Sequence, residues 1–191
     1  MKKVRLGPCV TFFPQPTTLV STLSAAGEVN VMTASWAGIV SKSPPTMAVS
    51  LHQNRKSYEN IKERGEFVVN MVPASLAVEA DYCGIRSGHD LDKLETVGLH
   101  TEKAAVVSVP LIAESPLSVE CKLTLELPLG DYRLLIGEIV EIHVAAESQR
   151  EDGSMDVELL DPLVYLGGIR EYWSLGKKQA TAYKDGLSLE K

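Results

Sequence analysis

The chain has 191 residues, 45% of them hydrophobic, which indicates a folded domain of ordinary size and excludes wholesale disorder. The formal net charge of -6 and the lack of long basic runs argue against a surface for nucleic acid or anionic membranes. No apolar run approaches the roughly 20 residues of a membrane-spanning helix, and none follows the basic N-terminus, so we expect a cytoplasmic protein.

Cysteines and histidines are few and widely spaced. The three cysteines form no Cys-x-x-Cys pair: Cys9, Cys83 and Cys121. The four histidines show no metal-ligand spacing: His52, His89, His100 and His143. We therefore predict free thiols in a reducing compartment and no metal site. His143 lies two residues from Glu141 in a predicted strand, so both should share one face, in a polar barrel or interface position.

The N-terminal part of the chain is predicted to consist mostly of strands. The β-branched residues over 17–23 and 29–36 predict two strands, joined by a turn at Gly27. Two prolines within 41–45 predict a loop, because proline restricts the backbone and removes a donor. Strand character then resumes over 46–51.

Short helices and one buried strand are expected next. Ser57 is predicted to cap a short helix, and the apolar run 67–72 predicts a buried strand. Residues 73–82 have helical spacing, whereas the polar turn 87–94 leads into a short helix or loop. The pattern over 97–109 gives no firm assignment.

A long hairpin is predicted in the second half of the chain. Apolar and polar residues alternate over 119–127, which predicts a strand with one buried face. The turn 128–131 leads into a second long strand, 132–146, that should pair with the first. A last short strand is expected over 164–166, and the polar tail after Gln179 should pack loosely.

This order of elements predicts the fold class. Seven or eight strands with few helices favour a closed or nearly closed antiparallel β-barrel with helices outside. We expect one domain over residues 1–191, with its core over about 10–180. A Gly-x-Gly-x-x-Gly fingerprint is missing after the first strand, which argues against a classical dinucleotide fold. A Gly-x-Ser-x-Gly turn is missing too, so Ser-His-Asp hydrolysis is not supported.

Two stretches of sequence carry the candidate binding chemistry. Residues 29–36 run from a strand into small, hydroxylated residues and an indole, and small residues let a planar ligand approach the backbone. Residues 48–58 run from a strand into a polar turn with Arg55, Lys56 and Ser57, which can hold an anion. Together they indicate a mononucleotide such as a flavin phosphate.

Seven motifs in this order resemble the flavin reductase-like proteins with an FMN-binding split barrel, most closely the flavoredoxin-like branch. The motifs are NVMTASW from Asn30, SPP from Ser43 with AVSL from Ala48, RKSYENI from Arg55, FVVN from Phe67, SGHDLDK from Ser87, GDY from Gly130 with IGEI from Ile136, and PLVYLGG from Pro162. The resemblance covers roughly residues 10–180, and it is the order of the motifs that makes it specific.

The resemblance implies a mainly β split barrel with flanking helices, which forms a homodimer and binds FMN non-covalently near the subunit interface. The isoalloxazine is implied to lie along Thr33, Ala34 and Ser35, largely against backbone atoms. Ser50 and Leu51 are implied near the ribityl chain.

The phosphate is implied to lie near residues 55–57, with Lys93 approaching the cofactor from its polar turn. The resemblance also implies that Tyr165 or Tyr172 completes the pocket, and one interpretation is that the partner chain supplies this tyrosine. The candidate cofactor-binding residues are Asn30, Met32, Thr33, Ala34, Ser35, Trp36, Ser50, Leu51, Arg55, Lys56, Ser57, Lys93 and Tyr172.

A flavin itself carries hydride and electron chemistry, so we predict no catalytic side chain. The resemblance implies NAD(P)H or a reduced protein as the donor, and free flavin, ferric iron or a protein as the acceptor. Reductase partners of two-component monooxygenases carry a histidine in a Gly-Asp-His loop that is linked to nicotinamide binding. Tyr132 stands at that position, which argues against efficient direct reduction by NAD(P)H.

Other interpretations remain open at this point. The barrel could store or sense flavin or heme without catalysis, or serve only for dimerisation. At the residue level, Trp36 could be a core or interface aromatic, and Arg55 with Lys56 a solvated turn. Lys93 could pair with Asp90 at the surface, a pair worth only about 0.2 to 1 kcal/mol.

Overall fold

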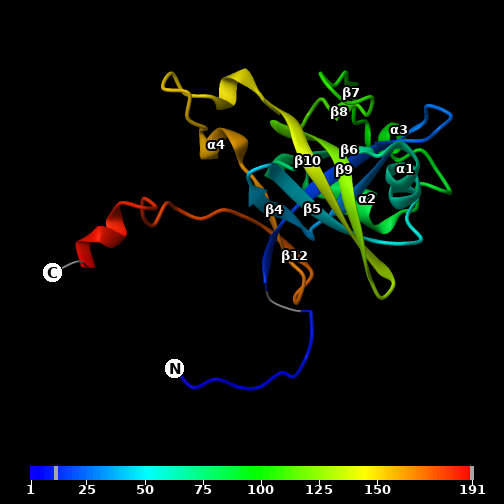
Figure 1. Ribbon diagram of the computed structural model, residues 1–191. Helices are drawn as coiled ribbons and strands as arrows, with labels where there is room; N and C mark the ends of the chain where they lie inside the picture. Colours follow the sequence, from blue (N-terminus) through cyan, green and yellow to red (C-terminus); the bar gives the residue numbers. More distant parts are fainter. Residues whose placement is uncertain (11–12, 190–191) are drawn as a thin grey trace.

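The main sheet of the protein has seven strands in the order β3-β2-β6-β9-β10-β5-β4. The computed structural model describes residues 1–10 and 13–189, and every strand pairing among them is antiparallel. The strands of this sheet are β2 Thr18–Leu23, β3 Val29–Ala34, β4 Ala37–Lys42, β5 Pro45–His52, β6 Glu66–Met71, β9 Leu117–Leu129 and β10 Tyr132–Val144. The predicted mainly β, antiparallel architecture is confirmed (Figure 1).

The two edges of this sheet are joined by a very short link. β3 and β4 follow one another in the chain but lie at opposite edges, and only Ser35 and Trp36 separate them. The Ser50 amide of β5 donates to the Trp36 carbonyl over 2.8 Å. The sheet therefore curls until its edges meet at this link, and β3 and β4 are not hydrogen-bonded to each other there. We call the line between these edges the seam.

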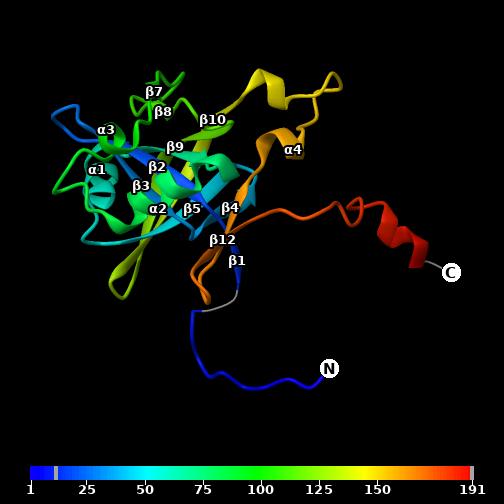
Figure 2. The ribbon, with the colours of Figure 1, turned by 180° about the vertical axis from the view of Figure 1, so that it is seen from behind.

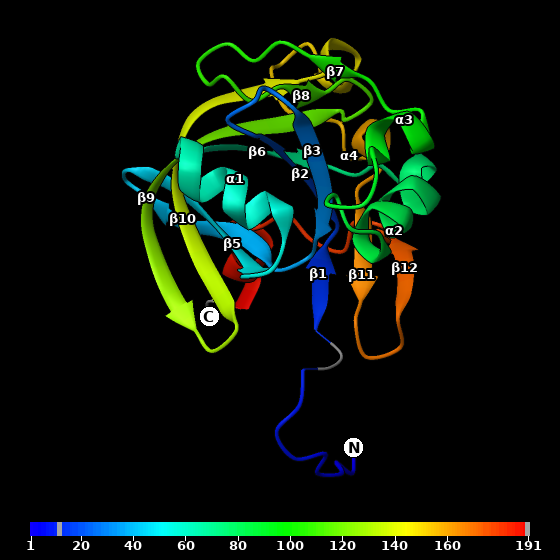
Figure 3. The same cartoon turned by 90° about the vertical axis from the view of Figure 1, so that its right-hand side faces the viewer.

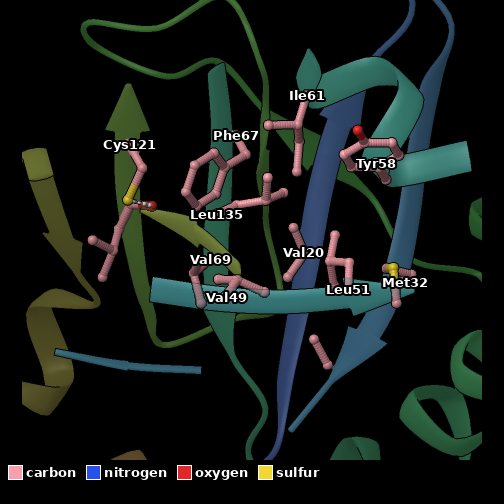
Figure 4. Close-up of a cluster of buried hydrophobic side chains, with 12 residues drawn as sticks. Val20, Met32, Val49, Leu51, Tyr58, Ile61, Phe67, Val69, Cys121 and Leu135 are labelled. Carbon is pink, nitrogen blue, oxygen red and sulfur yellow. Dashed lines mark hydrogen bonds between the residues drawn. The ribbon is translucent and has the colours of Figure 1, made fainter. Parts of the chain in front are cut away.

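The interior of the barrel is filled by apolar side chains from several strands (Figure 4). Phe67 of β6 and Leu135 of β10 are fully buried and share one cluster with Val20 of β2 and Val49 of β5. A Cβ at Gly137 would lie only 2.7 Å from the Phe67 ring. Glycine at this position therefore lets β10 pass the ring without displacing it.

Helices and two small sheets complete the structure. The helices are α1 Lys56–Arg64, α2 Ala77–Ile85, α3 Lys93–Val97 and α4 Val157–Leu160, with 3-10 turns η1 Ala74–Leu76, η2 Ala146–Ser148 and η3 Asp185–Leu189. One small sheet contains β1 Pro14–Pro16, β11 Leu163–Leu166 and β12 Glu171–Ser174, and the other β7 Thr101–Glu102 and β8 Leu111–Ile112. Figure 2 shows β1 and β12 near each other, where the terminal segments leave the body.

The β9–β10 hairpin is confirmed, but its burial differs from the prediction. The hairpin projects from the body as an arm (Figure 1). Leu125, Leu127 and Leu129 on this arm are exposed, because the rest of the barrel does not reach them. Glu120, which alternation placed on a polar face, is completely buried. The prediction of one buried face over the whole strand was therefore wrong.

Several predicted boundaries also change. The strand predicted over 29–36 ends at Ala34, because Ser35 and Trp36 bend the chain. The loop predicted over 41–45 is largely strand: β4 ends at Lys42 and β5 begins at Pro45. The strand predicted over 132–146 ends at Val144, where η2 follows. Residues 180–189 are exposed, which agrees with the predicted loose packing of the tail.

Candidate functional site

The candidate site lies where β3 passes between helices (Figure 3). α1 contacts β3 on one side, and α2 and α3 contact it on the other. The loop 86–92 connects α2 with α3 and brings its backbone against β3. Residues from four separate segments therefore meet over one strand.

Positively charged side chains gather around a narrow cavity at this point. Arg55, Lys56 and Lys93 line it together with Arg86, and the buried Ser57 lies among them. α1 begins here, and no side chain within the described residues caps its first turn. A helix N-terminus carries partial positive charge and free amide donors, so it adds to the attraction for an anion. We call these five residues the cationic cluster.

Asn30 connects the cationic cluster to β3. Its Nδ2 donates to Ser57 Oγ over 2.8 Å, and both side chains are buried. Ser57 therefore bonds across to β3 instead of capping its own helix, so the predicted cap was wrong. A Cβ at Gly88 would lie 1.8 Å from Asn30 Oδ1, so only glycine allows the loop to approach this closely.

Lys93 is a buried ammonium with carbonyl partners. Its Nζ donates to the Cys83 carbonyl over 3.1 Å and to the Arg86 carbonyl over 3.4 Å, near the C-terminus of α2. The alternative surface pair with Asp90 was therefore wrong. Burial lowers the pKa of Lys93 to about 8, opposed by the Cys83 thiol and aided by Arg55 and Lys56. Burial of a positive charge costs free energy that a bound anion would offset, so Lys93 is a strong candidate for binding an anion.

The stretch from Thr33 to Trp36 presents mostly backbone at the seam. Thr33 Oγ1 donates to the Ala80 carbonyl of α2, so its hydroxyl is already engaged. Ala34 is buried, and its carbonyl accepts from Thr18 Oγ1 over 2.6 Å. Main-chain atoms and Ser35 are therefore what this stretch can offer a planar ligand.

Trp36 is 38% exposed and belongs to an aromatic group with Tyr132 and His52. Its ring lies 4.9 Å from that of Tyr132, which in turn meets His52 edge-on at 5.3 Å. Trp36 also lines a hollow of about 440 Å³ that includes Tyr165. Trp36 is thus a surface aromatic rather than a core residue.

The other predicted site residues are more dispersed. The Leu51 and Met32 side chains belong to the barrel core, although Met32 also borders the cationic cluster. The Ser50 amide of β5 is engaged in the strand hydrogen bond to the Trp36 carbonyl. Tyr172 donates to Asp81 Oδ1 of α2 over 3.1 Å, and burial together with Asp81 raises its pKa. Tyr172 therefore packs on α2 and lies outside the lining of the cationic cluster.

Sequence reasoning missed Arg86 and Gly88. Arg86 directly precedes the SGHDLDK motif and Gly88 lies within it, but only the fold shows that this loop returns to Asn30. It also missed Glu120, whose two oxygens accept from the amides of Ala105, Val106 and Val107 at 2.7–2.8 Å.

His143 completes the shell around this carboxylate. Its Nε2 lies 2.5 Å from Glu120 Oε1, so Glu120, and not Glu141, is its partner. Burial opposes ionisation of Glu120, but the backbone donors and His143 outweigh it and lower its pKa. Among the described residues no group of three or more His, Cys, Asp or Glu side chains is arranged to hold a metal ion.

Comparisons with known proteins agree with this architecture. The family described as flavin reductase like domain matches residues 10–174. A protein of Archaeoglobus fulgidus, described as uncharacterized, is 34% identical over 145 residues, which cover 76% of this chain and 80% of that protein. Within the described part of the chain, no helix has the length and apolar character needed to span a membrane.

Two solved structures are similar over almost their whole length. The flavoredoxin of Desulfovibrio vulgaris (Miyazaki F) is 35% identical with a TM-score of 0.92, covering 97% of this chain and 100% of that one. The flavoredoxin from Methanosarcina acetivorans is 28% identical with a TM-score of 0.90, covering 99% and 100%. The predicted split-barrel architecture and the flavoredoxin-like resemblance are confirmed.

Proposed function

The chain belongs to the flavin reductase-like family, and from this premise we propose that it is an oxidoreductase that holds FMN and passes electrons from a reduced protein to an acceptor. The observation that carries the proposal is the cationic cluster at the start of α1, a few residues along β3 from the bare backbone at the seam. This arrangement suits a ligand with a phosphate at one end and a flat ring at the other.

The cationic cluster fits a phosphate in charge and in donors. Arg55 and Lys56 supply charge at the N-terminus of α1, where free amides add hydrogen bonds. Lys93 offers a third N–H beyond the two engaged with carbonyls. A phosphate placed here would offset the mutual repulsion of these cations and of Arg86.

The ring of FMN is proposed to lie along Thr33–Trp36. Because the Thr33 hydroxyl is engaged with Ala80, its backbone and that of Ser35 would bond the polar edge of the ring. FMN supplies the hydride and electron chemistry when bound, and the protein orients it and tunes it electrostatically. Trp36 would border the exposed side of the ring.

A protein donor is favoured over NAD(P)H by the identity of residue 132. Tyr132 stands where monooxygenase-partner reductases are expected to have a histidine, and it packs on Trp36 and His52. The chain therefore has a phenol, and not an imidazole, at the position that the family resemblance links to nicotinamide binding. Electron transfer from a protein donor does not need this histidine.

Flavin binding is the first test. The purified protein should show the visible absorption of bound flavin or acquire it on addition of FMN. Arg55→Ala should weaken FMN binding by about 1.5 to 3 kcal/mol, the range for hydrogen bonds to charged groups. Titration of FMN fluorescence measures this, with exposed Arg170→Ala as the matched control that leaves affinity unchanged. Colourless protein that no FMN reconstitutes would refute the proposal.

Turnover is the second test. Stopped-flow mixing of the FMN-loaded protein with NADH or NADPH should bleach the flavin slowly, whereas a reduced electron-carrier protein such as a ferredoxin should bleach it rapidly. Rapid bleaching by a nicotinamide would identify a direct NAD(P)H reductase instead. No bleaching by any donor would favour a flavin store or sensor.

A further inference from the structure

A cavity of about 320 Å³ lies between the small β7–β8 sheet, the start of β9 and the end of β10. It shares no lining residue with the cationic cluster, so the proposed function leaves it without an occupant. Its volume falls at the lower end of the range of about 300–1,000 Å³ typical of small-molecule sites. The polar side chains that line it are Glu102, Ser115, Ser118, His143 and Glu147.

His143 is held in place from behind by a buried carboxylate. Glu120 is completely buried, and its Oε1 lies 2.5 Å from His143 Nε2. Because Glu120 is an acceptor, a neutral imidazole carries its proton on Nε2 and keeps Nδ1 as an acceptor. A carboxylate orients histidines in this way at sites where the second nitrogen binds a ligand. The proposed flavin chemistry uses neither residue.

The two serines of the cavity have already committed their hydroxyl protons. Ser115 Oγ lies 2.7 and 2.8 Å from the carbonyls of Met71 and Leu117, so its proton goes to one of them. Ser118 Oγ donates over 2.8 Å to Asn70 Oδ1, which also accepts from a backbone amide. Each hydroxyl therefore has only lone pairs left for a ligand.

The rest of the lining adds negative charge and few donors. The backbone amides of Ala113, Ser115 and Ala145 donate to carbonyls at 2.9–3.1 Å. Glu102 and Glu147 contribute carboxylates, and none of the described lining residues is a lysine or an arginine. The polar side chains of this cavity thus all accept hydrogen bonds, which selects a ligand that is positively charged and rich in N–H donors.

We propose that this cavity is a binding site for a small organic cation with a guanidinium group. A planar guanidinium has five or more N–H donors, which match acceptors spread over several directions. A bare metal ion fits less well, because among the described residues no three His, Cys, Asp or Glu side chains are arranged to hold one. This inference goes beyond the proposed function and does not depend on it.

The experiment titrates three probes into the full-length protein by isothermal calorimetry. Butylguanidinium has both charge and N–H donors, butylurea has the donors without the charge, and tetramethylammonium has the charge without the donors. Butylguanidinium should bind at least about ten-fold more tightly than either of the others, because charge-assisted hydrogen bonds are the stronger kind.

Variants place the binding in this cavity. The double variant Glu102→Gln with Glu147→Gln keeps the size of both side chains and removes their charge, and it should weaken butylguanidinium binding at least about ten-fold. His143→Phe keeps a flat ring without the acceptor and should weaken binding about five-fold or more. Glu138→Gln removes an exposed carboxylate that lies outside the lining, and as the matched control it should leave binding unchanged.

Circular dichroism and the urea midpoint show whether each variant has folded, and the exposed glutamates of the double variant make it the safer one. Weakened binding in a folded double variant, with the control unchanged, supports the site. The inference is overturned if butylguanidinium does not bind, if butylurea or tetramethylammonium binds equally well, or if the folded double variant binds as the wild type does. FMN binding is measured separately, so failure here leaves the proposed function untouched.

Discussion

The protonation of one side chain, Lys93, controls the charge of the cationic cluster. Because burial lowers the pKa of Lys93 to about 8, its side chain is mostly protonated at pH 7 and loses its positive charge as the pH rises past 8. We expect FMN affinity to decline above pH 8, since a neutral amine attracts a phosphate less. Binding of the phosphate raises this pKa, so the decline continues over the next pH unit or more.

Lys93→Met should remove this pH dependence and weaken FMN binding about ten- to hundred-fold at pH 7, the loss of a charge-assisted hydrogen bond. Fluorescence titrations between pH 6.5 and 9.5 measure both effects. Lys62→Met, which removes an exposed lysine from α1, is the control. A variant that keeps the wild-type pH profile would exclude Lys93 from the site.

Gly137 illustrates how one missing methyl group can decide packing. Gly137→Ala would bring a Cβ to 2.7 Å from Phe67 Cζ and 3.0 Å from the Cys121 Cβ, so one of the strands must shift. Overpacking of this kind costs about 1 to 3 kcal/mol. Urea denaturation should show that loss, and Gly38→Ala in β4, where a Cβ meets nothing within 4 Å, should be near neutral. Equal stability of the two variants would contradict this account.

At the scale of elements, a buried carboxylate holds the loop 103–110 on β9. Glu120 receives three loop amides, and Glu66 Oε2 accepts from both the amide and the hydroxyl of Ser108. Glu120→Gln replaces one carboxylate oxygen, an acceptor, by an NH2 group, a donor, which would face the backbone N–H donors of the loop. We expect a loss of about 2 to 3 kcal/mol in the free energy of unfolding, with exposed Glu138→Gln as control.

The same carboxylate should govern acid stability. Its pKa is lowered in the folded state, so its contribution is present above the ordinary glutamate value of about 4.3 and is lost as pH falls through the folded-state pKa. Wild-type stability should therefore decline more steeply below pH 4 than that of Glu120→Gln. If the free energy of unfolding falls with the same slope below pH 4 in both proteins, Glu120 is not the source of the acid sensitivity.

The sequence predicted those elements whose signals are local. The β9–β10 hairpin has a periodic apolar pattern and a short turn, and β6 is a continuous apolar run. Both signals are visible in the sequence itself. The bend at Ser35 and Trp36 was missed because apolar residues continue across it into β4. The burial of Glu120 was missed because its partners come from the loop 103–110, which has no pattern of its own.

The candidate site shows the same division. The residues 55–57 were predicted because they are adjacent in the chain and follow a strand. Arg86 joins them only because α2 and α3 pack on β3, and Tyr172 was expected at the site whereas it pairs with Asp81. Convergence of distant segments depends on helix packing, which local spacing does not encode.

At the scale of the whole molecule, the projecting arm predicts self-association. Leu125, Leu127 and Leu129 expose apolar side chains along one hairpin, and such clusters mark interaction surfaces in soluble proteins. We expect a homodimer in which this arm contacts the second copy. Leu127→Asp should shift the protein to monomer in sedimentation velocity, whereas Val78→Asp on exposed α2 should not. A wild-type monomer at micromolar concentration would refute this prediction.

The two-residue link at the seam has a mechanical consequence. Chain geometry limits the distance from Ala34 to Ala37 to roughly 10 Å, so the two sheet edges have almost no slack between them. Any breathing of the barrel must pull on Ser35 and Trp36, the residues proposed to border the ring. The fluorescence emission of a flavin bound there, or of Trp36 itself, would therefore report on deformation of the barrel.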